Sequence, residues 1–330
     1  MKMVFIGASG HAMQAVDALP RFPEIEVTAV AAVHPSEDMG GLADSIAAHR
    51  PRPRILPDWR QMLAEEMPDI AVVNPWYSMN ADVAAECLLS GCHVFTEKPV
   101  ATDWKGYEKL LSAYRSTGRD LAPMFDLLYA PWFLAMEQAV NAGLIGRVRL
   151  IHGQKSYKMG RRGEQYHKRA LYGGMIPWVG IHMVGLAERI AGPAQAAAAF
   201  QSDGENRNHG ELETAASLIL RHGGGVITSI DCDYFRPDGS ATHGDDRLRI
   251  TGTRGMVEAI HGKVYLENEE SRRELSLPEE ESPFDAFYTA IGTERAKVLA
   301  KEAFTATAAC LAAREAGDLG RMLEVPEWNA

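Results

Sequence analysis

The chain opens with Met3-Val4-Phe5-Ile6-Gly7-Ala8-Ser9-Gly10-His11-Ala12, and this stretch decides the fold. Residues 3–6 are a short apolar run, which is typical of a buried strand, and residues 10–20 are expected to form a helix. Glycine is needed where a strand turns tightly into a helix and where the backbone approaches a pyrophosphate. The stretch therefore predicts a dinucleotide site, with the pyrophosphate on the backbone amides of Ser9 to His11.

A second segment, Gly91-Cys92-His93-Val94-Phe95-Thr96-Glu97-Lys98-Pro99, predicts another buried strand that ends at a lysine. Ligands of open α/β sheets bind at the carboxyl ends of the strands. Most lysines are solvated surface charges, but this one ends a buried strand and precedes a proline. We therefore expect Lys98 to be catalytic and to donate hydrogen bonds to a substrate oxygen.

The first part of the chain alternates apolar strands with helices. Expected strands follow at 25–33, 70–74 and 94–96, and the helices between and after them include 80–90 and 103–115. Alternation of this kind indicates a doubly wound parallel sheet, the Rossmann fold. We place this dinucleotide-binding domain at residues 1–121.

Residues 122–330 have a different pattern, in which strands follow one another with few helices between them. The expected strands are 147–157, 194–201, 213–221, 225–233, 247–251, 256–260 and 263–267. This succession predicts an α+β domain with a large, mostly antiparallel open sheet covered by helices on one face. The uncovered face predicts a homodimer or homotetramer, with Leu218, Leu220, Val226, Ile227 and Ile230 as apolar interface candidates.

Composition narrows the classes of function. The chain has 330 residues, 46% hydrophobic and 24% charged, as expected of a two-domain globular protein. A net charge of −10 argues against a nucleic-acid surface. The four cysteines lack zinc-ligand spacing, so we expect reduced thiols and no metal site. The N-terminus has no basic segment and no long apolar run, which favours a cytoplasmic protein without a signal peptide or membrane span.

The order and spacing of the motifs resemble the Gfo/Idh/MocA family, named for glucose–fructose oxidoreductase, inositol dehydrogenase and a rhizopine-catabolism protein. The resemblance covers nearly the whole chain. It rests on the segments 7–12, 68–75, 91–99, 143–148, 173–182 and 247–255. It implies an NAD(P)-dependent oxidoreductase that transfers hydride between nicotinamide and a hydroxyl or ketone of a sugar, sugar acid, polyol or inositol-like metabolite. In family members the Lys98–Pro99 peptide is often cis, and we predict the same here.

The resemblance also implies which residues bind the cofactor. We expect these to be Gly7, Ala8, Ser9, Gly10, His11, Ala12, His34, Asn74, Pro75, Trp76, Glu97 and Lys98. Ser9 stands at the family's second glycine position and Ala12 at the third. Ala32 stands where a carboxylate usually binds the ribose of NAD. The cofactor is therefore NAD or NADP, and we favour NADP, with His34 near its 2′-phosphate.

At the reacting end, the family pairs an aspartate with a histidine four residues later. The histidine is His182, which we expect to exchange a proton while Lys98 polarises the substrate oxygen. The aspartate position is Trp178, whose ring either stacks on a sugar or fills core volume. Asp126, Tyr157 and His167 complete the substrate-binding residues that we expect. The basic segment 157–172 either binds a carboxylate-bearing sugar or is an exposed loop.

Two other functions remain open at this point. One is a binding protein that senses a dinucleotide without turnover, which the loss of the family aspartate at Trp178 favours and the intact Glu97-Lys98-Pro99 motif opposes. The other is a redox-neutral lyase or glycosidase that uses tightly bound NAD. Net reduction of added cofactor separates a dehydrogenase from both.

Overall fold

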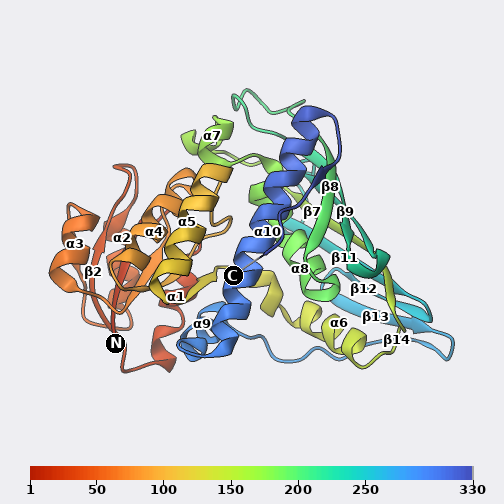
Figure 1. Cartoon of the computed structure of the whole chain (residues 1–330), viewed down its shortest axis with the longest axis horizontal. Coiled ribbons are helices and arrows are strands. Elements are labelled where there is room, and N and C mark those ends of the chain that lie inside the picture. The colour runs from red at the N-terminus through yellow and green to blue at the C-terminus, as the bar shows by residue number, and fades with distance from the viewer. Residues whose placement is uncertain (329–330) are drawn as a thin grey trace. The chain divides into compact units, whose positions relative to one another are not determined.

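The computed structural model describes residues 1–328 and divides into two compact units, which are drawn in Figure 1. The first unit comprises residues 1–124 and 282–304. The second comprises residues 125–281 and 305–328. Each unit is built on one sheet.

The first unit contains a six-stranded sheet in the order β3-β2-β1-β4-β5-β6, and every neighbouring pair is parallel. The strands are β1 (Lys2–Ile6), β2 (Glu26–Ala31), β3 (Arg54–Leu56), β4 (Ile70–Val73), β5 (His93–Thr96) and β6 (Leu121–Pro123). This is the strand order of a doubly wound dinucleotide-binding fold, with the switch point between β1 and β4. The predicted Rossmann sheet is confirmed.

Helices connect these strands, and an aspartate side chain caps the start of three of them. They are α1 (Met13–Val16), α2 (Met39–Ala47), α3 (Trp59–Glu66), α4 (Asn80–Leu89) and α5 (Trp104–Thr117), with short 3₁₀ turns at Leu19–Arg21 and Tyr77–Met79. The Asp58 carboxylate accepts from the amides of Arg60 and Gln61 at the start of α3. Asp103 caps α5 in the same way through the Gly106 amide. Such caps satisfy amides that have no partner within the helix.

The first unit also includes α9 (Pro283–Ala290) and the start of α10 (Glu294–Leu319). The rings of Phe284 and Phe287 both lie 5.4 Å from the ring of Phe95 on β5, and both side chains are buried. Burial of each phenylalanine stabilises the fold by about 1.5–3 kcal/mol relative to exposure. These residues complete the core of the first sheet, although the sequence boundary had left them in the second domain.

The second unit contains a nine-stranded sheet in the order β14-β13-β12-β11-β7-β10-β9-β8-β15. Its strands are β7 (Val148–Tyr157), β8 (Ala194–Ser202), β9 (Ala215–His222), β10 (Ile227–Asp233), β11 (Gly244–Gly252), β12 (Gly255–Ile260), β13 (Lys263–Asn268), β14 (Arg272–Glu274) and β15 (Leu323–Glu324). Only the β7–β10 pair is parallel, and the other pairs are antiparallel. The predicted large, mostly antiparallel sheet is confirmed.

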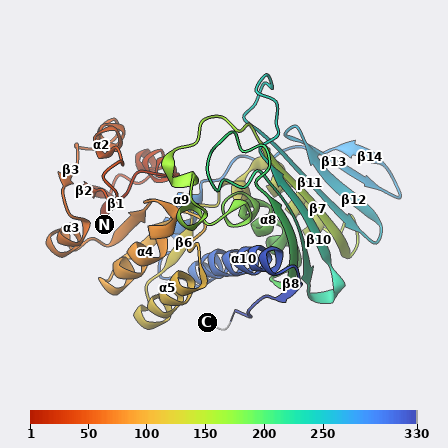
Figure 2. The same cartoon turned by 90° about the horizontal axis from the view of Figure 1, so that it is seen from above.

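Helices α6 (Pro131–Asn141) and α8 (Ile181–Ala191) belong to this unit, and Figure 2 shows α8 against one face of the sheet. The short turns are Asp126–Tyr129, Glu164–Tyr166, α7 (Arg169–Tyr172), a π-helical turn at Ile176–Gly180, and Gly223–Gly225. One helical stretch, residues 169–191, has the length and mean hydropathy (1.3) of a membrane span. Because 89% of its apolar window is buried in the structure, it has the character of a core helix.

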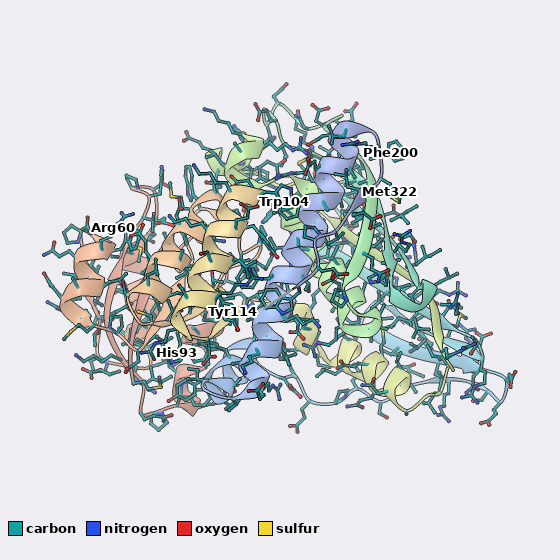
Figure 3. All side chains as sticks on the ribbon, in the orientation of Figure 1. Arg60, His93, Trp104, Tyr114, Phe200 and Met322 are labelled. Atoms are coloured by element: carbon teal, nitrogen blue, oxygen red, sulfur yellow. The ribbon has the colours of Figure 1, made fainter. Side chains whose placement is uncertain are left out.

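Side chains alternate between the two faces of the sheet, and this corrects the predicted interface residues. Leu218, Leu220 and Ile230 are buried on the helix-covered face, and Val226 is buried as well. The prediction that these four form an exposed apolar surface is therefore wrong, because neighbouring residues in a strand point to opposite faces. The exposed large apolar residues of the central strands are Leu150, Phe200, Ile219 and the predicted Ile227; Phe200 is labelled in Figure 3.

Candidate functional site

The turn after β1 requires glycine at two positions. Gly7 has a φ of +82°, and a Cβ atom there would lie 2.4 Å from the backbone nitrogen of Pro75. A Cβ atom on Gly10 would lie 2.5 Å from Oδ1 of Asn74 and would overlap the Glu97 carboxylate. The turn therefore packs directly against the ends of β4 and β5, where the sequence predicted cofactor contacts at Asn74, Pro75 and Glu97.

Two of the amides that were expected to bind the pyrophosphate are used within the protein. The Ser9 amide donates to the Asn74 carbonyl at 2.8 Å, and the His11 amide donates to Glu97 Oε2 at 2.7 Å. Among residues 1–328, the Gly10 amide has no acceptor, and the buried side-chain amide of Asn74 has no partner. These groups fit a bound dinucleotide, which would supply both a phosphate oxygen and a partner for Asn74.

A carboxylate that the sequence analysis missed, Glu37, joins this turn to the end of β2. Its Oε1 accepts from the Ser9 hydroxyl at 2.8 Å, and its Oε2 accepts from the amides of Val33 and His34 at 2.8 and 2.9 Å. Glu37 lies in the loop beyond the expected ribose position, Ala32, so counting along the strand did not find it. A carboxylate nevertheless occupies the carboxyl end of β2.

His34 and Trp76 lie together beside this loop. Their rings are stacked with centroids 3.7 Å apart, and His34 Nδ1 lies 2.7 Å from the Ser36 hydroxyl. His34 follows β2 and Trp76 follows β4. The two strands therefore bring both predicted cofactor residues into one aromatic pair at the edge of the sheet.

Lys98 is held at the end of β5 by buried polar contacts. Lys98 is only 2% exposed, and the Lys98–Pro99 peptide is cis, as predicted. The Asn80 side-chain amide donates to the carbonyls of Glu97 and Pro99, at 3.2 and 3.1 Å, and so fixes the backbone on both sides of Lys98. The sequence analysis assigned no role to Asn80, which lies at the start of α4.

Glu97 links the lysine to the phosphate-binding turn. Its carboxylate accepts from the Lys98 amide at 2.9 Å and lies 2.8 Å from His11 Nδ1. Burial opposes its ionisation, but the charge and hydrogen bonds of His11, together with the charge of Lys98, lower the pKa of Glu97. Glu97 is thus an ionised group that orients the residues on both sides of it.

In the second unit, a carboxylate lies close to His182. Its Nδ1 lies 3.3 Å from Oδ1 of Asp126, which begins the short turn after β6. The histidine is buried in α8, whereas the Asp126 side chain is 45% exposed. Sequence reasoning assigned Asp126 to the substrate and did not pair it with His182, because the two residues are far apart in the chain.

Trp178 packs in an aromatic cluster. Its ring lies 4.5 Å from Tyr166 and 5.9 Å from Tyr234, and the Arg162 guanidinium lies 5.3 Å from its centroid. Because Trp178 is buried, most of its ring contacts protein. A direct role in substrate binding stays a prediction.

Tyr157 and His167, the other predicted substrate residues, lie in different surroundings. Tyr157 ends β7 and stacks on His243 at 5.0 Å, with Lys155 Nζ 4.9 Å from its ring centroid. The ring of His167 lies 5.3 Å from that of His209 in the loop before β9. Among residues 1–328, no group of three histidine, cysteine, aspartate or glutamate side chains is placed to hold a metal ion.

Comparison with known proteins agrees with this geometry. Residues 1–125 match the oxidoreductase family with an NAD-binding Rossmann fold, and residues 133–258 match the GFO/IDH/MocA C-terminal domain. The chain belongs to the Gfo/Idh/MocA family. A protein from Thermotoga maritima that is described as an oxidoreductase is 37% identical to this chain. Its structure superposes with a TM-score of 0.94 over 98% of this chain and 100% of that one.

Two more distant similarities were found, one in structure and one in sequence. Levoglucosan dehydrogenase in complex with NADH has a TM-score of 0.81 at 14% identity, over 99% of this chain and 100% of that one. A glycosyl hydrolase family 109 protein from Shewanella putrefaciens is 22% identical over 161 residues, or 48% of this chain. That match spans only 35% of the hydrolase, about a third of its length.

Family membership gives the His182–Asp126 pair its significance. In the resemblance described above, the usual carboxylate partner of the histidine lies one helical turn before it, at the position of Trp178. Here the carboxylate comes instead from Asp126, before α6. The arrangement keeps a histidine–carboxylate pair while the usual position is filled by a packed aromatic ring.

Proposed function

We propose that this chain is a dehydrogenase or reductase that transfers hydride between NAD and a hydroxyl or ketone of a sugar, sugar acid, polyol or inositol-like compound. The observation that carries the proposal is the buried lysine at the end of β5. Asn80 and Glu97 fix Lys98 beside a turn whose glycines permit close approach of a pyrophosphate.

In the proposed mechanism, bound NAD supplies the hydride acceptor or donor. Lys98 donates a hydrogen bond to the substrate oxygen and stabilises its developing charge. His182 exchanges the hydroxyl proton, and Asp126 orients the imidazole and stabilises its charged form. Incubation of the protein with NAD and a panel of sugars, sugar acids and inositols should produce reduced nicotinamide, measured by absorbance. A folded protein that binds NAD but reduces none with any of these compounds would contradict the proposal.

A redox-neutral glycosidase is the second candidate function, and the partial similarity to a glycosyl hydrolase favours it. In that case hydride would return to the sugar and added NAD would show no net reduction. Release of sugar from a glycoside without accumulation of reduced cofactor would distinguish this activity from a dehydrogenase.

We infer that the cofactor is NAD rather than the NADP favoured from the sequence, because Glu37 places a carboxylate at the end of β2. A carboxylate there suits a ribose diol and repels a 2′-phosphate. Glu37→Gln should narrow the preference for NAD over NADP by about tenfold, equivalent to ~1.4 kcal/mol. Calorimetric titration of each cofactor measures the change.

The control for this substitution is Glu65→Gln, which removes an exposed carboxylate from α3. It should leave both affinities unchanged. Tighter binding of NADP than of NAD by the unsubstituted protein would contradict the inference, whatever the variants do.

We also propose that the uncovered face of the nine-stranded sheet joins two copies of this chain. Leu150 and Ile227 are direct neighbours on β7 and β10, and Ile219 lies opposite Ser229 across the β9–β10 pair. Together with Phe200, which is 81% exposed, they form the apolar part of this face. Contiguous exposed apolar patches on folded proteins commonly mark interaction sites.

Ile219→Asp should shift the protein from dimer or tetramer towards monomer, because the new carboxylate would be buried against an apolar surface without a partner. Light scattering at micromolar concentration measures the mass. Leu89→Asp, on an exposed position of α4 in the first unit, is the matched control and should leave the mass unchanged. An unsubstituted protein that is already monomeric would refute the proposed interface.

A further inference from the structure

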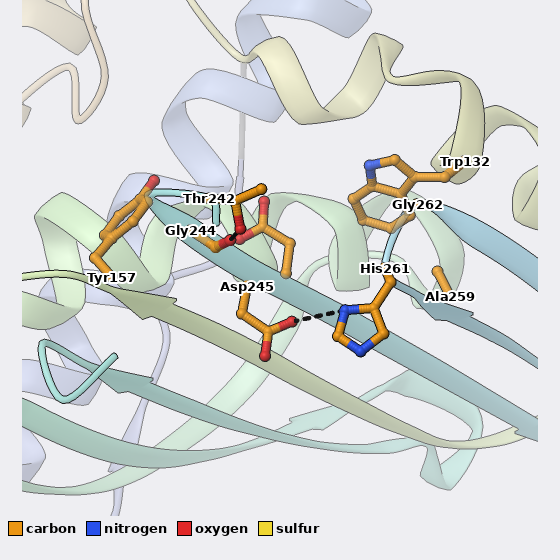
Figure 4. A pocket seen from close by; sticks show the side chains of 9 residues that line it. Trp132, Tyr157, Thr242, Gly244, Asp245, Ala259, His261 and Gly262 are labelled. Carbon is orange, nitrogen blue, oxygen red and sulfur yellow. Dashed lines mark hydrogen bonds and ion pairs between the residues drawn. The ribbon is translucent and has the colours of Figure 1, made fainter. Parts of the chain in front are cut away.

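The second unit contains a cavity of about 460 Å³ next to the end of β7 (Figure 4). Its walls include Trp132 from the start of α6, Tyr157 from β7, and residues of β11 and of the hairpin after β12. The size lies within the range of about 300–1,000 Å³ that is usual for small-molecule sites. No step of the proposed hydride transfer uses this cavity.

We propose that the cavity is a subsite for a second sugar ring, so that the substrate is a disaccharide or glycoside and not a free monosaccharide. This inference rests on the proposed function, because it names the substrate class of the same enzyme. It commits to a neutral, hydroxylated ring as the occupant.

The walls provide the two kinds of contact that a sugar ring makes. Figure 4 shows the Trp132 indole on one side of β11, and the side chains of Asp245 and His261, which lie next to each other, on the other side of that strand. The apolar C–H face of a pyranose can pack on an aromatic ring, while its hydroxyls donate to a carboxylate or bond to an imidazole or hydroxyl group. Tyr157 and Thr242 add two more hydroxyl groups.

Charge pairing in the walls favours a neutral occupant over a cation. Arg247 donates to Asp245 at 2.8 Å, and Arg236 lies 3.4 Å from the same carboxylate. The hydrogen bond and charge of Arg247 hold the pKa of Asp245 below its usual range. Lys155, which is buried, binds Asp246 at 2.7 Å. Both carboxylates therefore already have cationic partners from the protein.

An anion is also disfavoured. Asp245 and Asp246 both line the cavity, whereas no lysine or arginine of residues 1–328 is among the lining side chains. A carboxylate or phosphate group would thus meet carboxylate side chains without a direct cationic contact. A hydroxylated ring satisfies the carboxylates without adding charge.

Tyr157 connects this cavity with the proposed proton-transfer residues. Burial raises the pKa of Tyr157, the charge of Lys155 opposes that rise, and the charges of Asp246 and Asp126 add to it. Asp126 is the residue that pairs with His182. A ring bound against Tyr157 would therefore lie within the electrostatic range of the carboxylate beside the proposed base.

The first test compares kcat/KM for glucose and galactose with the values for cellobiose, maltose and lactose, using the full chain and NAD. The unsubstituted protein should favour at least one disaccharide over its monosaccharide. Trp132→Ala should reduce that ratio by about tenfold, the effect of losing one aromatic contact. Trp132→Phe, which keeps an aromatic face, should retain most of the ratio. Equal kcat/KM for monosaccharides and disaccharides, unaffected by either variant, would overturn the subsite.

Saturation-transfer NMR of the same disaccharides separates the subsite from the reaction, because it needs neither NAD nor turnover. Binding that is lost in Trp132→Ala and weakened in His261→Ala, but kept in the first-unit control Trp104→Ala, supports the subsite even if no sugar is oxidised. In that event the dehydrogenase proposal fails and the subsite stands. Oxidation of monosaccharides without any Trp132-dependent binding of disaccharides would support the dehydrogenase proposal and overturn the subsite. Circular dichroism of each variant verifies folding, and the exposed His261 gives a second test if Trp132→Ala does not fold.

Discussion

Lys98→Met should lower kcat by about 10²–10⁴-fold, the usual contribution of a positioned group that assists proton transfer or charge development. Methionine has a similar length but cannot donate a hydrogen bond to the substrate oxygen. Affinity for NAD should remain nearly unchanged, since the turn is built from backbone groups of Gly7 and Gly10 and from Glu37. Steady-state kinetics and calorimetric titration with NAD measure the two effects separately.

Two controls make this result specific. Lys297→Met removes an exposed lysine from α10 and should have no effect on kcat. Lys98→Arg keeps the charge but changes the donor geometry, so it should recover only part of the activity. Unchanged turnover in Lys98→Met would defeat the proposed mechanism, because that mechanism gives no other residue the role of donating to the substrate oxygen.

Residues that act through local patterns could be predicted from the sequence. Gly7 was identified because the end of a buried strand followed by a tight turn requires a positive φ, and the structure gives it one. Asp103 likewise begins the helix expected at residues 103–115, and the structure shows it as the cap of α5. In each case the physical cause lies within a few residues of the chain, so the order of residue types carries the information.

Contacts between distant segments could not be predicted in this way. Glu37 contacts the turn from a loop whose path no local pattern predicts. Asp126 lies beside His182 although the two are far apart in the sequence. Phe284 and Phe287 return to a core whose strands end much earlier in the chain. Leu218, Leu220 and Ile230 were assigned to the wrong face of the second sheet, because which face the helices cover depends on packing.

The His182–Asp126 pair leads to the second prediction with a large effect. His182→Ala should lower kcat by about 10²–10⁴-fold if the imidazole exchanges the substrate proton. Asp126→Asn should lower it by about tenfold, because it removes the negative charge that lies 3.3 Å from His182 Nδ1, and each 1.36 kcal/mol changes the rate tenfold. The partly exposed asparagine should cost little stability, so thermal unfolding should be nearly unchanged.

The double variant distinguishes a working pair from two separate contributions. If Asp126 acts by orienting His182 and stabilising its charged form, Asp126→Asn should have little further effect once His182 is alanine. If Asp126 instead binds a substrate hydroxyl on its own, the two losses should multiply, and Asp126→Asn alone should raise KM more than it lowers kcat. Multiplied losses would therefore remove Asp126 from the proton-transfer step. They would also leave His182 without a carboxylate in place of the one that the family has at the position of Trp178.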